Sequence, residues 1–191
     1  MAKFIIRLAD EKVFQVLIIK RKGSIMVKKI VDALNQQVNA EYWSAYLYLS
    51  MSLDAEAKGY KGTANWMFCQ WLEEQEHARV LQKFIMAIGG NVELKPIATV
   101  PLKWKGIHEM FREALQQEKK VTEKIYSIVS LAAKENDYAT VSHLQWFVNE
   151  QVEEEQTLDE ILRSLDIIGD DKAAVYEFDQ TLRERRTENC A

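Results

Sequence analysis

The sequence has little of what usually interrupts or cross-links a polypeptide chain. Its 191 residues include two prolines, seven glycines and two cysteines. So few turn-forming residues favour long uninterrupted elements. Cys69 and Cys190 do not form the spaced framework of a metal cluster or a disulfide-rich scaffold. Because cysteine is so scarce, a reducing cytoplasm is the expected location.

Two further absences narrow the function. No apolar run approaches the roughly 18 residues that a membrane-spanning helix needs, so we expect no membrane span. The formal net charge is -4, from 29 acidic and 25 basic residues. This balance disfavours nucleic acid as a partner and suits a protein that attracts cations. Hydrophobic residues make up 48% of the chain, which is enough for one domain with a sizeable core.

Residues 1–25 differ from the rest of the chain. Residues 13–19 read Val-Phe-Gln-Val-Leu-Ile-Ile, which is more typical of a strand than of a helix. Charges at Arg7 and Asp10 interrupt any signal-peptide core. We therefore interpret residues 1–25 as an N-terminal extension outside the fold. It is either the product of a start codon set upstream of Met26 or a poorly ordered arm.

After the extension, apolar residues recur with a helical period. The pattern predicts four long helices and a short fifth one, at residues 27–57, 63–88, 106–133, 138–168 and 171–185. Thr63 is expected to cap the second helix, and Gly89-Gly90 to end it. The predicted fold class is all-α, with one domain over residues 26–185 and a flexible tail at residues 186–191.

The lengths of the links predict the topology. Short links make the first and second helices, and the third and fourth, antiparallel hairpins. The middle link has about 16 residues and spans about 50 Å when extended, at roughly 3.3 Å per residue. A helix of about 26 residues is only about 39 Å long. The link can therefore cross the whole bundle and set the third helix parallel to the second.

Each long helix carries polar residues on its apolar face near its middle. They are Glu41 on the first helix, Glu74 and His77 on the second, Glu118 on the third, and Gln151 and Glu154 on the fourth. Mid-helix positions meet at one height, so these groups should converge. Unpaired buried carboxylates cost several kcal/mol each, and no Lys or Arg lies on these faces near the acids. Carboxylates with one histidine favour iron, manganese or zinc over calcium.

Each of these groups has a simpler interpretation when it is taken alone. Glu74 and His77 form a Glu-x-x-His pair, which is common by chance on helix surfaces. The run Glu153-Glu154-Glu155 is usually a solvated helix face. Tyr48 and Trp146 would be core aromatics. The metal interpretation rests on the joint register of the four helices, and the competing one is a structural bundle.

From Met26 to about Arg185 the chain resembles the non-haem bacterial ferritins. The matching motifs are Asn39-Ala40-Glu41 followed by Tyr48, Glu73-Glu74-x-x-His77, Glu118, and Gln145-Trp146-Phe147-Val148-Asn149-Glu150-Gln151-x-Glu153-Glu154. The resemblance implies a ferritin-like four-helix bundle whose Glu41, Glu74 and His77 hold a first iron. Glu74, Glu118 and Gln151 would surround a second iron, with Glu74 bridging and Tyr48 beside the pair.

The same resemblance implies a third iron site and an assembly. Glu73, Glu150, Glu153 and Glu154 match the third site, and the short last helix would line the fourfold axis of a 24-subunit homo-oligomeric shell. The implied function is iron storage without haem. Fe(II) is oxidised by O2 or H2O2 at a diiron ferroxidase centre, and hydrated ferric oxide is kept inside the shell.

The fourth helix departs from related diiron proteins. It carries Gln151-x-x-Glu154, whereas bacterioferritins and rubrerythrins have a second Glu-x-x-His, so the second iron should be held more weakly. Two other functions are alternatives to iron storage. A diiron peroxidase of rubrerythrin type would need a rubredoxin-like cysteine cluster, which two isolated cysteines do not supply. A self-assembling helical bundle without catalysis would bind no metal.

Overall fold

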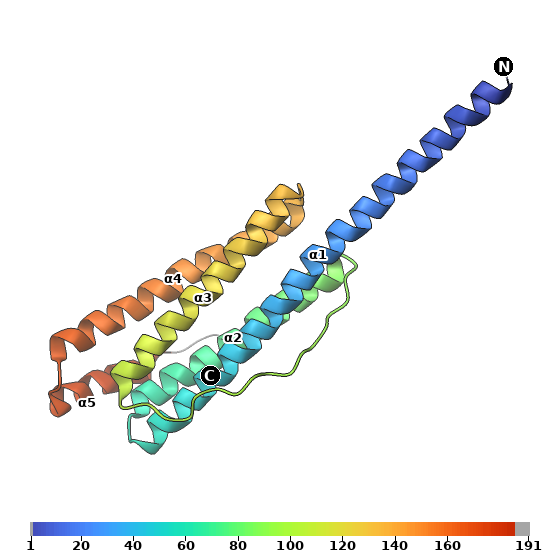
Figure 1. Ribbon diagram of the computed structural model, residues 1–191. Helices are drawn as coiled ribbons and strands as arrows, with labels where there is room; N and C mark the ends of the chain where they lie inside the picture. The colour runs from blue at the N-terminus through green and yellow to red at the C-terminus, as the bar shows by residue number, and fades with distance from the viewer. Residues whose placement is uncertain (1, 186–191) are drawn as a thin grey trace.

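The computed structural model describes residues 2–185, with side chains from residue 28 onward. Its elements are α1 (Ala2–Ala57), α2 (Lys61–Ala87), α3 (Ile107–Lys134), α4 (Tyr138–Ile168), α5 (Lys172–Thr181) and a 3-10 turn, η1 (Leu182–Glu184). The four long helices lie side by side, and α5 folds back at one end (Figure 1). The predicted all-α bundle with a short fifth helix is confirmed. The tail predicted at residues 186–191 lies outside the described residues.

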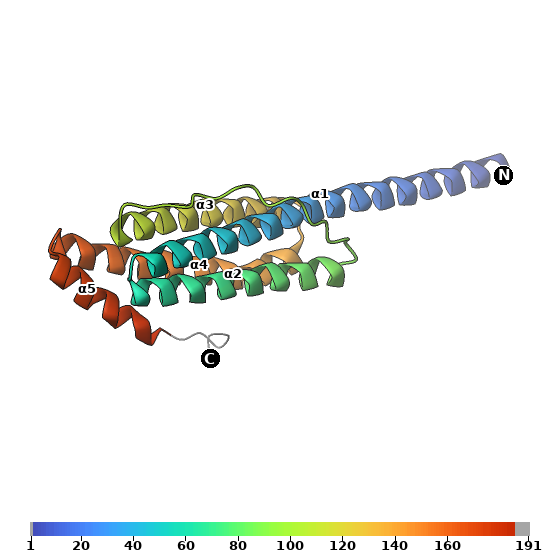
Figure 2. The same cartoon turned by 90° about the horizontal axis from the view of Figure 1, so that it is seen from below.

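The first helix is longer than the sequence pattern suggested. Residues 13–19 are helical and continuous with α1, so the expectation of a strand was wrong. The helix contains no proline and only one glycine, Gly23, and a helix once nucleated propagates through β-branched residues at small cost. The first part of α1 projects beyond the other helices (Figure 2). That residues 1–25 lie outside the domain stays a prediction.

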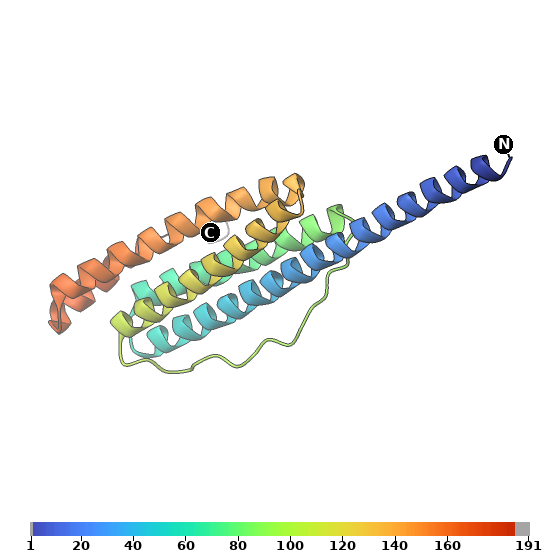
Figure 3. The same ribbon diagram turned by 45° about the horizontal axis from the view of Figure 1, so that its top comes forward.

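The link between α2 and α3 crosses the length of the bundle beside α1, which makes α3 parallel to α2 as predicted (Figure 3). Polar side chains of α1 hold its backbone. Asn35 donates to the Asn91 carbonyl at 2.9 Å and accepts from the Glu93 amide at 2.8 Å. Near the other end, Asp54 accepts from the Trp104 amide at 3.0 Å. These contacts satisfy backbone groups of the link that have no partner within a helix or sheet.

The boundary between α3 and α4 follows the predicted break. Asn136 has a φ of 57°, in the left-handed region that asparagine tolerates. The Asp137 carboxylate then accepts from the Thr140 amide at 3.1 Å and caps α4. The start of α2 differs from the expectation, since it lies at Lys61 and Thr63 is not its cap.

A residue of α5 caps α2 instead. The buried Asp179 carboxylate accepts from the Gly62 amide at 3.0 Å, from the Thr63 amide at 2.7 Å and from the Thr63 hydroxyl at 2.8 Å. A carboxylate is favoured at a helix N-terminus, where amides are unpaired and the helix dipole is positive. The backbones meet so closely that a Cβ on Gly62 would lie 1.5 Å from the Asp179 carbonyl oxygen. This contact docks α5.

Two apolar clusters fill the bundle on either side of a polar layer. One cluster includes Leu47, Met67, Phe111 and Leu158, and the other includes Leu34, Leu81, Val121, Ile125 and Phe147. The mid-helix polar residues fall between these two sets on every long helix. Trp146 is not a core aromatic, because its side chain is 43% exposed. The core therefore encloses the polar layer from both ends.

Replacing Gly62 by Ala should lower the thermal stability, because the new methyl group would force α5 away from α2. We expect a loss of about 1–3 kcal/mol, as for other overpacked sites. Thermal or denaturant unfolding measures it. Gly106→Ala is the matched control, since nothing lies within 4 Å of a Cβ there. Equal effects of the two changes would contradict the close contact.

Candidate metal centre

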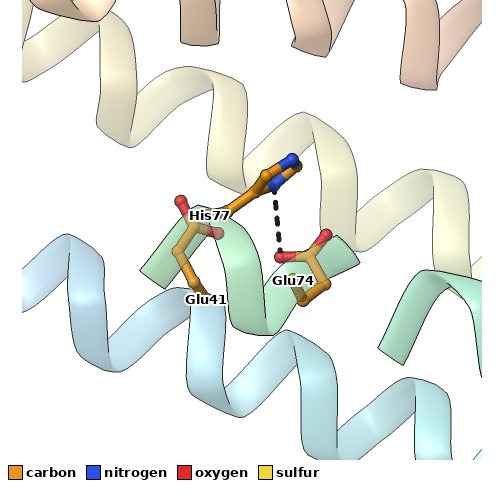
Figure 4. Close-up of side chains that lie close together, drawn as sticks. All are labelled: Glu41, Glu74 and His77. Carbon is orange, nitrogen blue, oxygen red and sulfur yellow. Dashed lines mark ion pairs between the residues drawn. The ribbon is translucent and has the colours of Figure 1, made fainter. Parts of the chain in front are cut away.

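Three buried side chains converge in the polar layer. Glu41 comes from α1, and Glu74 and His77 come from α2 (Figure 4). One ligand atom of each lies within 4.8 Å of the others. Glu74 and His77 share a helix face because they are three residues apart, and the Glu74 Oε2 lies 3.9 Å from the His77 Nδ1. The Glu41, Glu74 and His77 side chains thus form the group that the sequence predicted.

Each of the two carboxylates in this group has one buried oxygen without a hydrogen-bond partner. Glu41 Oε2 and Glu74 Oε2 are buried and accept no hydrogen bond. Burial raises the pKa of Glu41 from 4.5 to about 7. Burial, together with the charges of Glu118 and Glu41, raises the pKa of Glu74 well above its ordinary value. A bound cation would relieve both the desolvation and the repulsion, so the donor set fits a metal ion.

His77 offers a neutral ligand. Burial lowers its pKa from 6.5 to about 4, so the imidazole keeps a free lone pair at neutral pH. The ring packs edge-on against Trp146 and Phe147, with centroid distances of 5.4 and 5.8 Å. These contacts fix the ring without occupying its nitrogens. Carboxylate oxygens with one neutral imidazole suit iron, manganese or zinc.

Glu118 lies in a hydrogen-bonded cluster beside this group. Its Oε1 accepts from the Tyr48 hydroxyl, and its Oε2 accepts from the Gln151 amide at 3.1 Å. Burial raises the pKa of Glu118, and these two hydrogen bonds oppose the rise. Burial and the Glu118 charge raise the pKa of Tyr48 well above 10, so Tyr48 is a neutral donor. Residues from α1, α3 and α4 therefore meet at Glu118.

The four acids predicted for a third site have different surroundings. Glu154 is buried, and its Oε2 accepts from the Gln70 amide at 2.8 Å. Glu73 and Glu150 are half-buried, and Glu153 is exposed. Among the described residues, the carboxylate and histidine groups that converge closely enough to hold a metal include only Glu41, Glu74 and His77. The third site therefore remains a prediction.

Sequence reasoning missed three residues that contact these acids. Gln37 donates to Glu41 Oε1 at 2.8 Å, and it lies four residues earlier on the same face, a spacing that could have indicated it. Gln70 likewise lies four residues before Glu74, but it donates to Glu154 of α4. Arg185 forms an ion pair with Glu73 at 2.7 Å, and no local pattern could have shown that contact.

Comparisons with known proteins agree with this geometry. Residues 31–168 match the model of the ferritin-like domain. A bacterial non-heme ferritin of Staphylococcus haemolyticus is 37% identical over 161 residues, which are 84% of this chain and 97% of that protein. The open pore ferritin of Archaeoglobus fulgidus is 42% identical, with a TM-score of 0.81 over 83% of this chain and 98% of that one.

The chain belongs to the ferritin family. Ferritins store iron and oxidise Fe(II), and in this ferritin the buried Glu41, Glu74 and His77 supply a site of the matching chemistry. Members of the family form homo-oligomeric shells. Within the described residues, no helix is both long and apolar enough to cross a membrane. The predicted family, fold and ferroxidase activity are confirmed.

The stability of the metal-free ferritin should depend on the proton of Glu41. Because the pKa of Glu41 is raised from 4.5 to about 7, the folded protein binds this proton more tightly than the unfolded chain does. The resulting stabilisation is complete below pH 4.5 and is lost as the pH rises through about 7. Glu41→Gln cannot titrate there, so its stability should fall less between pH 5 and 8.

Denaturant unfolding in the presence of a chelator measures this difference. Glu123→Gln, which changes an exposed glutamate of α3, is the control and should follow the unmodified protein. If Glu41→Gln showed the same pH dependence as the unmodified protein, the shifted pKa would be refuted.

Proposed function

We propose that this ferritin oxidises Fe(II) at a diiron centre and stores Fe(III) as hydrated ferric oxide inside its shell. The observation that carries this proposal is the pair of unpartnered buried oxygens on Glu41 and Glu74 beside the neutral His77. Iron is the substrate. Anionic oxygen ligands stabilise Fe(III) more than Fe(II), so they favour the loss of an electron.

The first iron would bind Glu41, Glu74 and His77. The second would bind Glu118 and the Gln151 side chain, with Glu74 shared between the two ions. The shared position of Glu74 is supported by its electrostatics, because the charges of both Glu118 and Glu41 raise its pKa. Filling both positions would displace the carboxyl protons that burial retains in the metal-free protein.

Two ferrous ions held together can serve one oxidant. Each Fe(II) gives up one electron, and O2 takes two electrons and two protons to become H2O2. With H2O2 as the oxidant, two electrons and two protons yield two water molecules. The Tyr48 hydroxyl donates to Glu118, so Tyr48 can hold that ligand in place or supply an electron. Gathering two electrons at one site avoids a free one-electron product.

Gln151 distinguishes this centre from a symmetric one. Its amide is neutral and donates to Glu118, where an acid would add a negative charge. The second iron would therefore be held more weakly, which suits onward movement to the mineral. A peroxidase of rubrerythrin type is disfavoured, because the chain has only two cysteines for an electron-supplying cluster.

Glu73, Glu150, Glu153 and Glu154 would form a third iron site along this route. The support is their placement on α2 and α4, next to the residues of the diiron centre. Burial raises the pKa of Glu73, of Glu150 and of Glu154, so three of the four acids already lack full solvation. A cation at this position would compensate for that cost.

The assembly would be a 24-subunit shell in the cytoplasm. Its support is that ferritins form homo-oligomeric shells and that the chain spans nearly the whole of two relatives, 97% of the Staphylococcus haemolyticus ferritin and 98% of the Archaeoglobus fulgidus chain. The docked α5 is the element that would line a fourfold axis. Size-exclusion chromatography with mass detection should give a particle of about 24 chains, and a small oligomer would rule out the closed shell.

Glu41→Ala and His77→Ala should each slow rapid Fe(II) oxidation, because each change removes a ligand of the first iron. We expect a decrease of about tenfold or more. Aerobic addition of Fe(II), followed by absorbance, particle size and iron content, measures both oxidation and storage. Glu76→Ala is the control, since Glu76 pairs with Arg79 at the surface. Unchanged rates in both ligand variants would refute the site assignment.

A further inference from the structure

The chain returns to α2 after its last helical turn and places Arg185 against it. The Arg185 Nη2 lies 2.7 Å from Glu73 Oε2, and its guanidinium carbon lies 4.2 Å from the centroid of the Trp66 ring. The Asn65 side-chain amide donates to the Arg185 carbonyl at 3.1 Å. An ion pair, a cation–π contact and a hydrogen bond from a side chain to its carbonyl thus hold Arg185.

The charge of Arg185 reaches a second acid. Burial, followed by repulsion from Glu118 and Glu73, raises the pKa of Glu154 well above its ordinary value, and the Arg185 guanidinium opposes that rise. The same guanidinium opposes the rise that burial causes in the pKa of Glu73. Glu73 and Glu154 are two of the four acids assigned to the third iron site. Arg185 therefore carries a positive charge beside the position that iron would take.

We propose that Arg185 is a resident cation of the third iron site and competes with iron for Glu73. This inference rests on the third site in the proposed function. A carboxylate oxygen that accepts from a guanidinium has less electron density to give a metal ion, and the positive charge repels the incoming cation. Iron can fill the site fully only when Arg185 moves away from Glu73.

Arg185 is suited to displacement. Its Nη1 is buried without a hydrogen-bond partner, so the guanidinium is not fully satisfied where it lies. The Arg185 side chain is 22% exposed to solvent and the Glu73 side chain is 27% exposed, so water and ions can reach the pair. Arg185 follows η1 and lies outside the four long helices, so moving its side chain breaks none of their backbone hydrogen bonds.

A purely structural role is the competing explanation. Arg185 could serve only to anchor the end of the chain to Trp66 and Asn65. An anchor would change stability when it is removed and leave metal affinity unchanged. A competing cation would change the affinity of one class of metal sites. The two roles are therefore separated by measuring metal binding directly.

The test is calorimetric titration of the whole metal-free protein with Zn(II), which has no redox chemistry of its own. In this titration, the third site is identified as the class of Zn(II) binding that is lost in Glu153→Ala. In Arg185→Ala and Arg185→Gln, that class should bind about tenfold more tightly, a change equivalent to losing one favourable competing contact. Arg183→Ala is the matched control, because Arg183 is exposed and close in sequence, and it should bind as the unmodified protein does.

The outcomes separate this inference from the proposed function. If both Arg185 variants kept the original affinity while the melting temperature fell, Arg185 would be an anchor only and the third site would stand. If Glu153→Ala removed no binding in any background, the third site and the role of Arg185 would both be refuted. The diiron centre would be unaffected, since Glu41→Ala tests it separately.

Discussion

The burial of mutually repelling carboxylates in the middle of the bundle is the constraint on which this structure depends. Glu41, Glu74 and Glu118 are each at most 1% exposed, and burial raises the pKa of all three. Protonation relieves this cost in part. A divalent cation relieves it more completely, because one ion interacts with several carboxylates at once. The same feature therefore limits the stability of the metal-free protein and creates its affinity for iron.

The scaffold holds the acids against their repulsion. Apolar clusters above and below the polar layer pack all four long helices, so the acids cannot separate without exposing the core. Side chains of α1 hold the long link along the bundle, and Asp179 ties α5 to the start of α2. Neutral partners complete the layer, since Gln37 and Gln151 donate to the acids without adding charge.

The enclosed centre and the outer acids differ in how they are balanced. At the enclosed centre, the protein supplies neutral hydrogen-bond donors, and the iron that binds as substrate would supply the positive charge. At the outer acids, Arg185 supplies a positive charge to Glu73 and acts on Glu154. The contrast follows the difference in burial, since Arg185 pairs with half-buried Glu73, whereas Glu41, Glu74 and Glu118 are almost fully buried. Under the proposed function, in which the outer acids also bind iron, the two positions would differ in how readily they take and release it.

The sequence by itself determined the all-α fold, the crossover and the shared layer in which Glu41, Glu74 and His77 meet, because helical period and link length fix which faces meet. That Glu118 and Gln151 complete a metal centre with them stays a prediction. Sequence reasoning misjudged residues 13–19, since β-branched residues follow a nucleated helix at small cost. Only the tertiary structure decided that Asp179 caps α2 and that Arg185 pairs with Glu73. These contacts join residues more than a hundred positions apart, and no local spacing specifies where a distant segment docks.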